Sequence, residues 1–333
     1  MTRIIVLLLV LLGLAGALWW FQRPTEDAAM TTLAAERDFA VKNTDQIQKI
    51  FLADRSGETT TLERDGADRW KYNGQYAVRP NAIDNLLDAI RRIEMKYKPP
   101  QASKDYIVKN LATHGIKVEI YDRGNKLIKA YYIGDGTQDE RGTYAIVDGF
   151  NEPFVVNIPG WEGNLRFRYS LKGEDWRDKT VFRSGLREIA EVSIEYPKQK
   201  NLSFKLTQSN GQYEVKPFYE STPALQKPVQ KSRAETFLIG FENLVAENFE
   251  RNNLYRDSVK QLVPFSIITL KKTDGNVTSV RLFPINQFDQ VDDANLNDPQ
   301  IERYLADVST GDFMLVQDRV FRKVLWAYEF FFD

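Results

Sequence analysis

The sequence predicts an α+β protein, with an N-terminal transmembrane helix followed by two copies of a module in which a helix packs on a mostly antiparallel sheet. Three observations predict this fold class. An uncharged, mostly apolar run covers residues 4–21. Short segments of alternating polarity, separated by turns that contain glycine, fill much of the remaining chain. The same order of segments then recurs in the second half.

The apolar run Ile4–Phe21 decides on which side of a membrane the rest of the chain works. It holds 18 residues (21 − 4 + 1), and a helix that spans a bilayer needs about 20, with roughly 17 as the lower limit. A cleavable signal peptide, whose apolar core has about 7–15 residues, is the alternative. We expect residues 1–23 to be an uncleaved, single-pass anchor in the cytoplasmic (inner) membrane. Residues 24–45 are then a tether, and the later residues lie on the extracytoplasmic side.

The composition excludes several kinds of function. The chain is 43% hydrophobic and 27% charged, which is typical of a globular protein. Its 45 basic and 46 acidic residues nearly cancel, so nucleic acid is not an expected partner. With no cysteine and one histidine, the chain has no disulfides, no thiolate chemistry and no site that needs two histidines. We expect no catalytic residues, no cofactor and no metal ion.

The first module is predicted over residues 46–158. Pro80 opens a helix whose apolar residues fall on one face, and Pro99-Pro100 stops it. A shorter helix ends at His114-Gly115, where glycine commonly follows a helix. The predicted strands are a hairpin over 47–62, a strand at 70–72, and hairpins over 116–133 and 143–158.

The second module, residues 186–333, repeats this plan. The helix recurs at a constant shift of 154 (237 − 83, 241 − 87 and 244 − 90), with apolar positions through Val245. The shift drifts from 142 (189 − 47) to 160 (304 − 144), which indicates loop insertions. Beyond these repeats, the run from Val324 to Phe332 alternates like a terminal strand. The strands expected to recur are 189–195, 202–206, 213–215, 265–270, 278–283, 304–308 and 313–316.

The segment 159–185 connects the two modules and is rich in arginine and aromatic residues. It is expected to include a strand, Leu165–Tyr169. Because tryptophan, tyrosine and arginine dominate interface hot spots, it also supplies the candidate partner-binding residues. The alternatives are a core strand with a solvated edge and, for Trp176 to Lys179, a packed tryptophan beside a local ion pair. The candidates are Trp161, Arg166, Arg168, Tyr169, Trp176 and Arg177.

Two further features have a simple structural interpretation. His114 is the only histidine, and its place beside a helix-ending glycine favours a capping or surface role. The acidic loop Asp289–Asp298 offers oxygen ligands for calcium. An EF-hand would need glycine at the position of Asp298 and glutamate at that of Tyr304, so a solvated loop is the expected alternative.

Several segments together resemble a known family. The chain is similar to bacterial membrane-anchored proteins with a duplicated domain of unknown function, often encoded beside ABC-type transporters and related to auxiliary components of gliding-motility ABC systems. The resemblance implies an accessory role in an envelope complex. It extends over nearly the whole chain and is carried by the N-terminal anchor, Trp70 with Pro80 and Leu87, Leu111–Tyr121, Tyr132-Ile133-Gly134 with Thr143-Tyr144, and Trp176-Arg177-Asp178-Lys179.

These observations predict a non-enzymatic, membrane-anchored accessory or binding protein of a cell-envelope complex, in an ABC-type transport or gliding-motility system. Its expected partners are integral membrane or envelope proteins, ABC-transporter subunits among them. A glycan- or peptidoglycan-binding module is the alternative, because segment 159–185 is rich in aromatic residues. A hydrolase with scattered carboxylates would need two of them to converge in a deep pocket.

Overall fold

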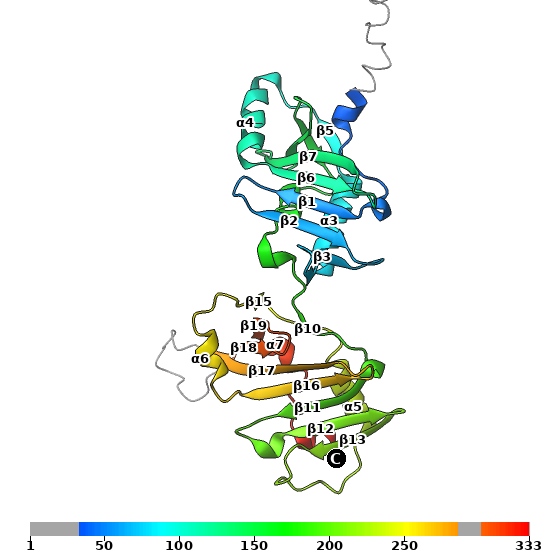
Figure 1. The fold of residues 1–333 in the computed structure, drawn as a ribbon, viewed down its shortest axis with the longest axis vertical. Helices are drawn as coiled ribbons and strands as arrows, with labels where there is room; N and C mark the ends of the chain where they lie inside the picture. Colours follow the sequence, from blue (N-terminus) through cyan, green and yellow to red (C-terminus); the bar gives the residue numbers. More distant parts are fainter. Residues whose placement is uncertain (1–32, 286–300, 333) are drawn as a thin grey trace, which may run out of the picture. The chain divides into compact units, whose positions relative to one another are not determined.

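The computed structural model describes residues 33–285 and 301–332, and these residues form two compact units, Met1–Asp178 (unit 1) and Lys179–Asp333 (unit 2) (Figure 1). The division between the units falls inside the segment 159–185 that was expected to connect them. Across the described ranges, no helix has the length and apolar character needed to cross a membrane. The predicted anchor Ile4–Phe21 lies outside the described residues.

Unit 1 is built on a nine-stranded sheet with the order β4-β3-β2-β1-β6-β7-β8-β9-β5. Every neighbouring pair is antiparallel, as the repeated hairpins predicted. The strands are β1 Lys49–Ala53, β2 Thr59–Arg64, β3 Trp70–Tyr72, β4 Tyr76–Ala77, β5 Glu94–Tyr97, β6 Ile116–Tyr121, β7 Leu127–Gly136, β8 Thr143–Val147 and β9 Phe154–Asn157.

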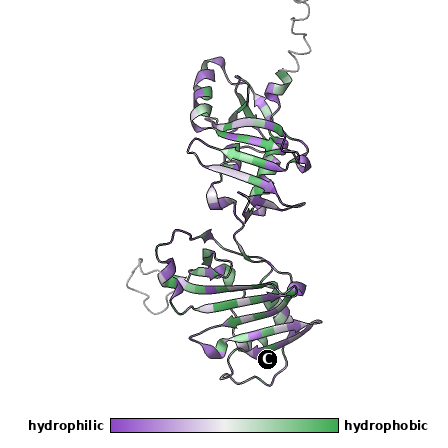
Figure 2. Ribbon diagram, viewed as in Figure 1, coloured by the Kyte–Doolittle hydropathy of each residue, from purple (hydrophilic) through white to green (hydrophobic). Residues whose placement is uncertain are grey.

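Two helices cover opposite faces of this sheet. Helix α3, Pro80–Arg92, buries its apolar stripe in the main core against the inner face. Helix α4, Lys104–His114, lies on the outer face, where Ile107 and Leu111 pack with Ile146. Helix α4 agrees with the sequence prediction. Helix α3 begins at Pro80 as predicted, but it ends at Arg92 and not at Pro99-Pro100, because Glu94–Tyr97 form the edge strand β5. Along the strands of both units, hydrophobic and hydrophilic residues alternate, so one face can be buried and the other solvated (Figure 2).

Unit 2 repeats the strand order of unit 1. Its eight-stranded sheet runs β13-β12-β11-β16-β17-β18-β19-β15, again antiparallel throughout. When strands are matched in chain order, each takes the place of its unit 1 counterpart, which is consistent with an internal duplication. The strands are β11 Ile189–Glu195, β12 Phe204–Ser209, β13 Gln212–Pro217, β15 Asn248–Phe249, β16 Ser266–Lys272, β17 Val277–Ile285, β18 Arg303–Val308 and β19 Phe313–Gln317.

The helix of unit 2 is shorter than predicted. Helix α5 spans Lys231–Ile239 and ends at Gly240, where an added Cβ would lie 2.9 Å from both the Phe237 carbonyl oxygen and a Val324 methyl. The expected continuation to Val245 is therefore wrong. Leu244–Val245 instead form β14, which pairs with β10, Thr180–Phe182. A short helix, α6, spans Arg256–Lys260.

Two predicted strands are 3₁₀ helices in the structure. Leu165–Arg168 form η3, whose first turn is capped by the Asn164 side chain accepting a hydrogen bond from the Arg166 amide at 2.9 Å. The C-terminal run from Val324 to Phe332 contains η7, Tyr328–Phe331, in place of a strand, and a short helix, α7, Asp318–Phe321, precedes it. Phe331 and Phe332 are both buried. Because neighbouring residues of a strand point to opposite faces, burying both in one core requires a turn.

Candidate interaction surfaces

Three of the six predicted partner-binding residues lie in the interior of unit 1. Tyr169, Trp176 and Arg177 are all buried, and the Trp176 indole nitrogen donates to the Leu171 carbonyl at 2.8 Å. The Arg177 guanidinium pairs with Glu174 at 2.8 Å. This arrangement matches the alternative given above for residues 176–179, a packed tryptophan beside a local ion pair. A partner cannot reach these side chains while the unit is folded.

Arg166 is at the surface but is used within the fold. Its Nη2 atom donates to the His114 carbonyl at 2.7 Å, and its Nη1 atom donates to the Ile133 carbonyl at 3.3 Å. It thereby ties the C-terminal end of α4 to β7, as a cation near the end of a helix dipole is expected to do. His114 itself is exposed in the last turn of α4.

The two remaining predicted residues, Trp161 and Arg168, lie on one surface together with Arg91, Arg92 and Phe167. We call these five residues the aromatic–arginine patch. The Trp161 and Phe167 ring centroids are 5.8 Å apart, and the Arg168 guanidinium carbon lies 5.1 Å from the Trp161 ring centroid. Phe167 is 55% exposed although it is a large apolar side chain. The patch therefore presents aromatic surface and cations together.

One carboxylate holds the three arginines in place. Asp88 accepts from Arg168 at 2.9 Å and pairs with Arg91 at 3.3 Å and Arg92 at 3.6 Å. Burial by itself raises the pKa of Asp88, but the hydrogen bonds from Arg168 and Arg91 outweigh it, so the pKa is lowered. Three guanidiniums against one carboxylate leave two net positive charges (3 − 1 = 2).

A second surface, in unit 2, was not predicted from the sequence. Leu254 is 92% exposed and Tyr255 is 70% exposed, and Leu262 and Val263 on the other side of α6 are also exposed. We call these four residues the apolar α6 surface. Helix α6 buries none of its own residues. The four residues follow neither a strand nor a helix period, so no pattern in the sequence marks them. The available signal was four large apolar residues in a stretch flanked by asparagines and Pro264.

Polar contacts fix this surface to the sheet. Lys260 of α6 pairs with Asp307 at 2.6 Å, and the Lys260 carbonyl accepts from the Arg281 guanidinium at 3.1 Å. Arg281 also pairs with Asp307 at 2.5 Å. The exposed apolar side chains therefore project from an anchored helix.

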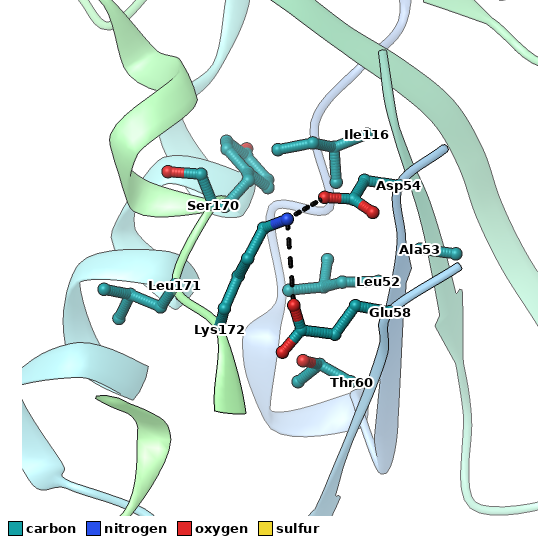
Figure 3. Close-up of a pocket in the computed structure, with 10 residues that line it drawn as sticks. Leu52, Ala53, Asp54, Glu58, Thr60, Ile116, Ser170, Leu171 and Lys172 are labelled. Carbon is teal, nitrogen blue, oxygen red and sulfur yellow. Dashed lines mark ion pairs between the residues drawn. The ribbon is translucent and has the colours of Figure 1, made fainter. Parts of the chain in front are cut away.

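A hollow beside Lys172 brings two carboxylates together (Figure 3). The Lys172 ammonium lies 2.5 Å from Asp54 and 3.7 Å from Glu58, and the cavity, of about 20 Å³, has room for about one water molecule. The hydrogen bond from Lys172 lowers the pKa of Asp54, which therefore stays ionised. A general acid needs a raised pKa, so this geometry suits an ion pair that pins the β1–β2 turn.

The acidic loop Asp289–Asp298, the possible calcium site in the sequence, lies outside the described residues. Among residues 33–285 and 301–332, no three histidine, aspartate or glutamate side chains converge in a way that could hold a metal ion.

Comparison with known families gives one match. The family DUF4340, a domain of unknown function, matches residues 70–262, which are 193 of the 333 residues (262 − 70 + 1). The chain belongs to the DUF4340 family. The match runs from β3 of unit 1 past α6 of unit 2, so the DUF4340 region contains the aromatic–arginine patch and most of the apolar α6 surface. No curated protein matches the chain. The expected resemblance is thus confirmed as far as a domain of unknown function.

Proposed function

We propose that this DUF4340 protein is a non-enzymatic, membrane-anchored accessory protein that stands on the extracytoplasmic side of the inner membrane. In this proposal Ile4–Phe21 is the anchor, and the apolar α6 surface binds an uncharged, apolar surface of an integral membrane or envelope protein. An ABC-type transport or gliding-motility complex is the system that the family resemblance implies.

The observation that carries this proposal is the exposure of the apolar α6 surface. Burying a leucine side chain contributes roughly 1.5–3 kcal/mol, so Leu254 and Leu262 alone offer a partner several kcal/mol. Residues 250–263 hold three basic and two acidic side chains, and Lys260 is already paired with Asp307. With so little net charge, this surface fits an apolar protein patch with a polar rim.

A glycan-binding function has less support. Trp176 has no exposed surface, and the Arg168 guanidinium lies over one face of Trp161. Of the two tryptophans predicted in segment 159–185, only Trp161 therefore offers a ring face on which a sugar could stack.

Site-directed crosslinking in native membranes tests the proposal. Because the chain has no cysteine, Leu254→Cys and Leu262→Cys each place a unique thiol for a photo-crosslinker on the surface. We expect both to form an adduct with the same membrane or envelope protein. Val277→Cys, an exposed position elsewhere in unit 2, is the matched control and should form none.

A second measurement uses charge. Introducing Leu254→Asp with Leu262→Asp should lower recovery of that partner at least tenfold, because two carboxylates would be desolvated in an apolar interface. Val277→Asp should recover wild-type amounts. Absence of adducts at both 254 and 262, or full recovery with the double aspartate variant, would overturn the proposal.

A further inference from the structure

We infer that the aromatic–arginine patch of unit 1 docks on the anionic headgroups of the membrane that holds the chain. This inference rests on the proposed function only through the anchor, Ile4–Phe21. It assigns the patch a different occupant from the protein partner proposed for the apolar α6 surface.

The chemistry of the patch suits lipid phosphates. The side chains of Arg91 and Arg92 are 55% and 43% exposed, so their guanidiniums can donate to phosphate oxygens while each still contacts Asp88. Arginine forks match phosphate geometry with two donors at once. The exposed ring of Phe167, beside Trp161, supplies apolar aromatic surface of the kind that surface-bound segments bury at the boundary between headgroups and acyl chains.

The path of the chain puts this patch near the anchor. Phe39, the first buried residue among those that the structure describes, leads into Val41, whose amide donates to the Ile90 carbonyl at 3.0 Å. The incoming chain therefore runs beside the last turn of α3, which carries Arg91 and Arg92. Phe39 lies 18 positions after Phe21 (39 − 21), a reach of at most about 65 Å. A short tether keeps the patch at a high effective concentration over the bilayer.

Net charge favours lipid over a protein occupant here. The cluster of Arg91, Arg92, Arg168 and Asp88 carries two net positive charges (3 − 1 = 2). The four residues that define the apolar α6 surface carry none. Each basic side chain at an anionic surface increases binding by about fivefold. A transmembrane anchor already holds the chain at the bilayer, so the patch needs only a modest affinity for headgroups in order to dock.

The test uses the full chain reconstituted in nanodiscs, without any partner protein. A nitroxide on Asn85→Cys, a neutral exposed position whose carbonyl accepts from Arg168, reports contact with nickel-chelating headgroups. Both kinds of disc carry the same small fraction of nickel-chelating lipid. We expect strong relaxation of the label when 30% of the other lipid is phosphatidylglycerol and little when all of the other lipid is phosphatidylcholine. Raising the salt concentration should weaken the effect in the anionic discs.

Charge removal tests the residues. Arg91→Gln with Arg92→Gln should lower the ratio of docked to undocked protein by roughly 25-fold in anionic discs. The matched control, Lys205→Gln with Lys216→Gln, removes two exposed charges from unit 2 and should leave the ratio unchanged. Because the lipid and salt comparisons use wild-type side chains at 91 and 92, they test the inference even if the arginine variant folds poorly.

Equal relaxation in neutral and anionic discs, or no change with the arginine variant, would overturn the inference. Failure of the chain to insert in the discs would overturn the anchor and the docking together. If docking fails while the adducts at 254 and 262 persist, only this inference is lost. If docking holds while those adducts are absent, the proposed partner function is lost instead.

Discussion

Helices α4 and α6 hold the same place in two sheets of the same strand order, yet they are attached by opposite kinds of contact. Each follows an edge strand, β5 or β15, and leads into a central one, β6 or β16. In unit 1, Ile107 and Leu111 of α4 pack on Ile146, with Tyr132 beside them. In unit 2, α6 is fixed by Lys260, Asp307 and Arg281.

The strand registers show that these contacts come from equivalent positions. Tyr132 stands opposite Ile146 across β7 and β8, and Arg281 stands opposite Asp307 across β17 and β18. An apolar pair in one unit is thus an ion pair in the other. The neighbouring inward-facing residues remain apolar in both units. The inner face must fill a core, whereas the outer face is free to change.

A glycine allows α4 to lie close to its sheet. A Cβ added at Gly134 would come within 2.7 Å of a Leu111 methyl, and the equivalent position in β17 is Phe283, which is buried. The small residue leaves room for an apolar helix, and the phenylalanine fills that room. Unit 2 has no such contact between its helix and its sheet among the described residues, and there the helix is short and the apolar residues on either side of it are exposed.

The largest expected effect is on α4. Leu111→Ala should lower the free energy of unfolding of unit 1 by about 2–3 kcal/mol, because it empties the contact over Gly134. Hydrogen exchange followed by mass spectrometry should show residues 104–114 losing protection while residues 256–260 are unchanged. Tyr106→Ala, an exposed change on the same helix, is the control. Equal protection in both variants would show that α4 is not held by this apolar contact.

An intermediate effect is expected for α6 on acidification. Burial raises the pKa of Asp307, but hydrogen bonds from Lys260 and Arg281 outweigh it, so the folded pKa is lowered. Its contribution to stability is therefore present above the usual aspartate pKa of about 3.9 and is lost as the pH falls through the lower folded value. Protection factors for residues 256–260 should fall below about pH 4. The protection factors of α4 should stay high in the same pH range, because the apolar contact of Leu111 holds that helix. They should do so although Glu152, which pairs with Lys104 of α4, also takes up a proton as the pH falls.

A variant checks the same interaction at neutral pH. Asp307→Asn leaves two cations without their partner and should cost about 1–2 kcal/mol, with loss of protection at α6. Asp257→Asn, an exposed carboxylate on the same helix, should cost less than about 0.5 kcal/mol. If α6 were equally protected at pH 3 and pH 7, the proposed ionic attachment would be wrong.

Most of the sheet could be predicted from the sequence because its strands alternate and its turns contain glycine. Pro80 and the 3.6-residue period likewise predicted where α3 begins and which face it buries, but not that it ends at Arg92, before β5. The misassigned segments are short ones, where alternation and a 3₁₀ turn look alike. In Leu165–Arg168 the capping residue Asn164 was the available signal for a turn. Around Phe331 the sequence holds no such signal, because consecutive apolar residues do not reveal which face each occupies.

The candidate surfaces were less predictable because exposure depends on tertiary packing. Trp161 and Trp176 lie in the same arginine-rich segment, yet one is part of a surface and the other is fully buried. Only the fold shows that Asp88 and Arg168, distant in sequence, meet on one patch. The apolar α6 surface was missed for the same reason. The equivalent segment of unit 1 buries Ile107 and Leu111, and only the structure shows that α6 in unit 2 buries none of its residues.

The smallest effect tests whether the inner face of unit 2 is as well satisfied as that of unit 1. Ser266 stands opposite Leu282, as Ile116 stands opposite Ile133, and its fully buried hydroxyl has no hydrogen-bond partner among the described residues. An unsatisfied buried hydroxyl costs roughly 1–3 kcal/mol, so Ser266→Ala should be neutral or raise the free energy of unfolding by up to about 1 kcal/mol. Ser203 is equally buried, but its hydroxyl accepts from the Tyr196 amide at 2.8 Å. Ser203→Ala should therefore lose about 1 kcal/mol in the same urea titration, and an equal loss in both variants would mean that the Ser266 hydroxyl is satisfied after all.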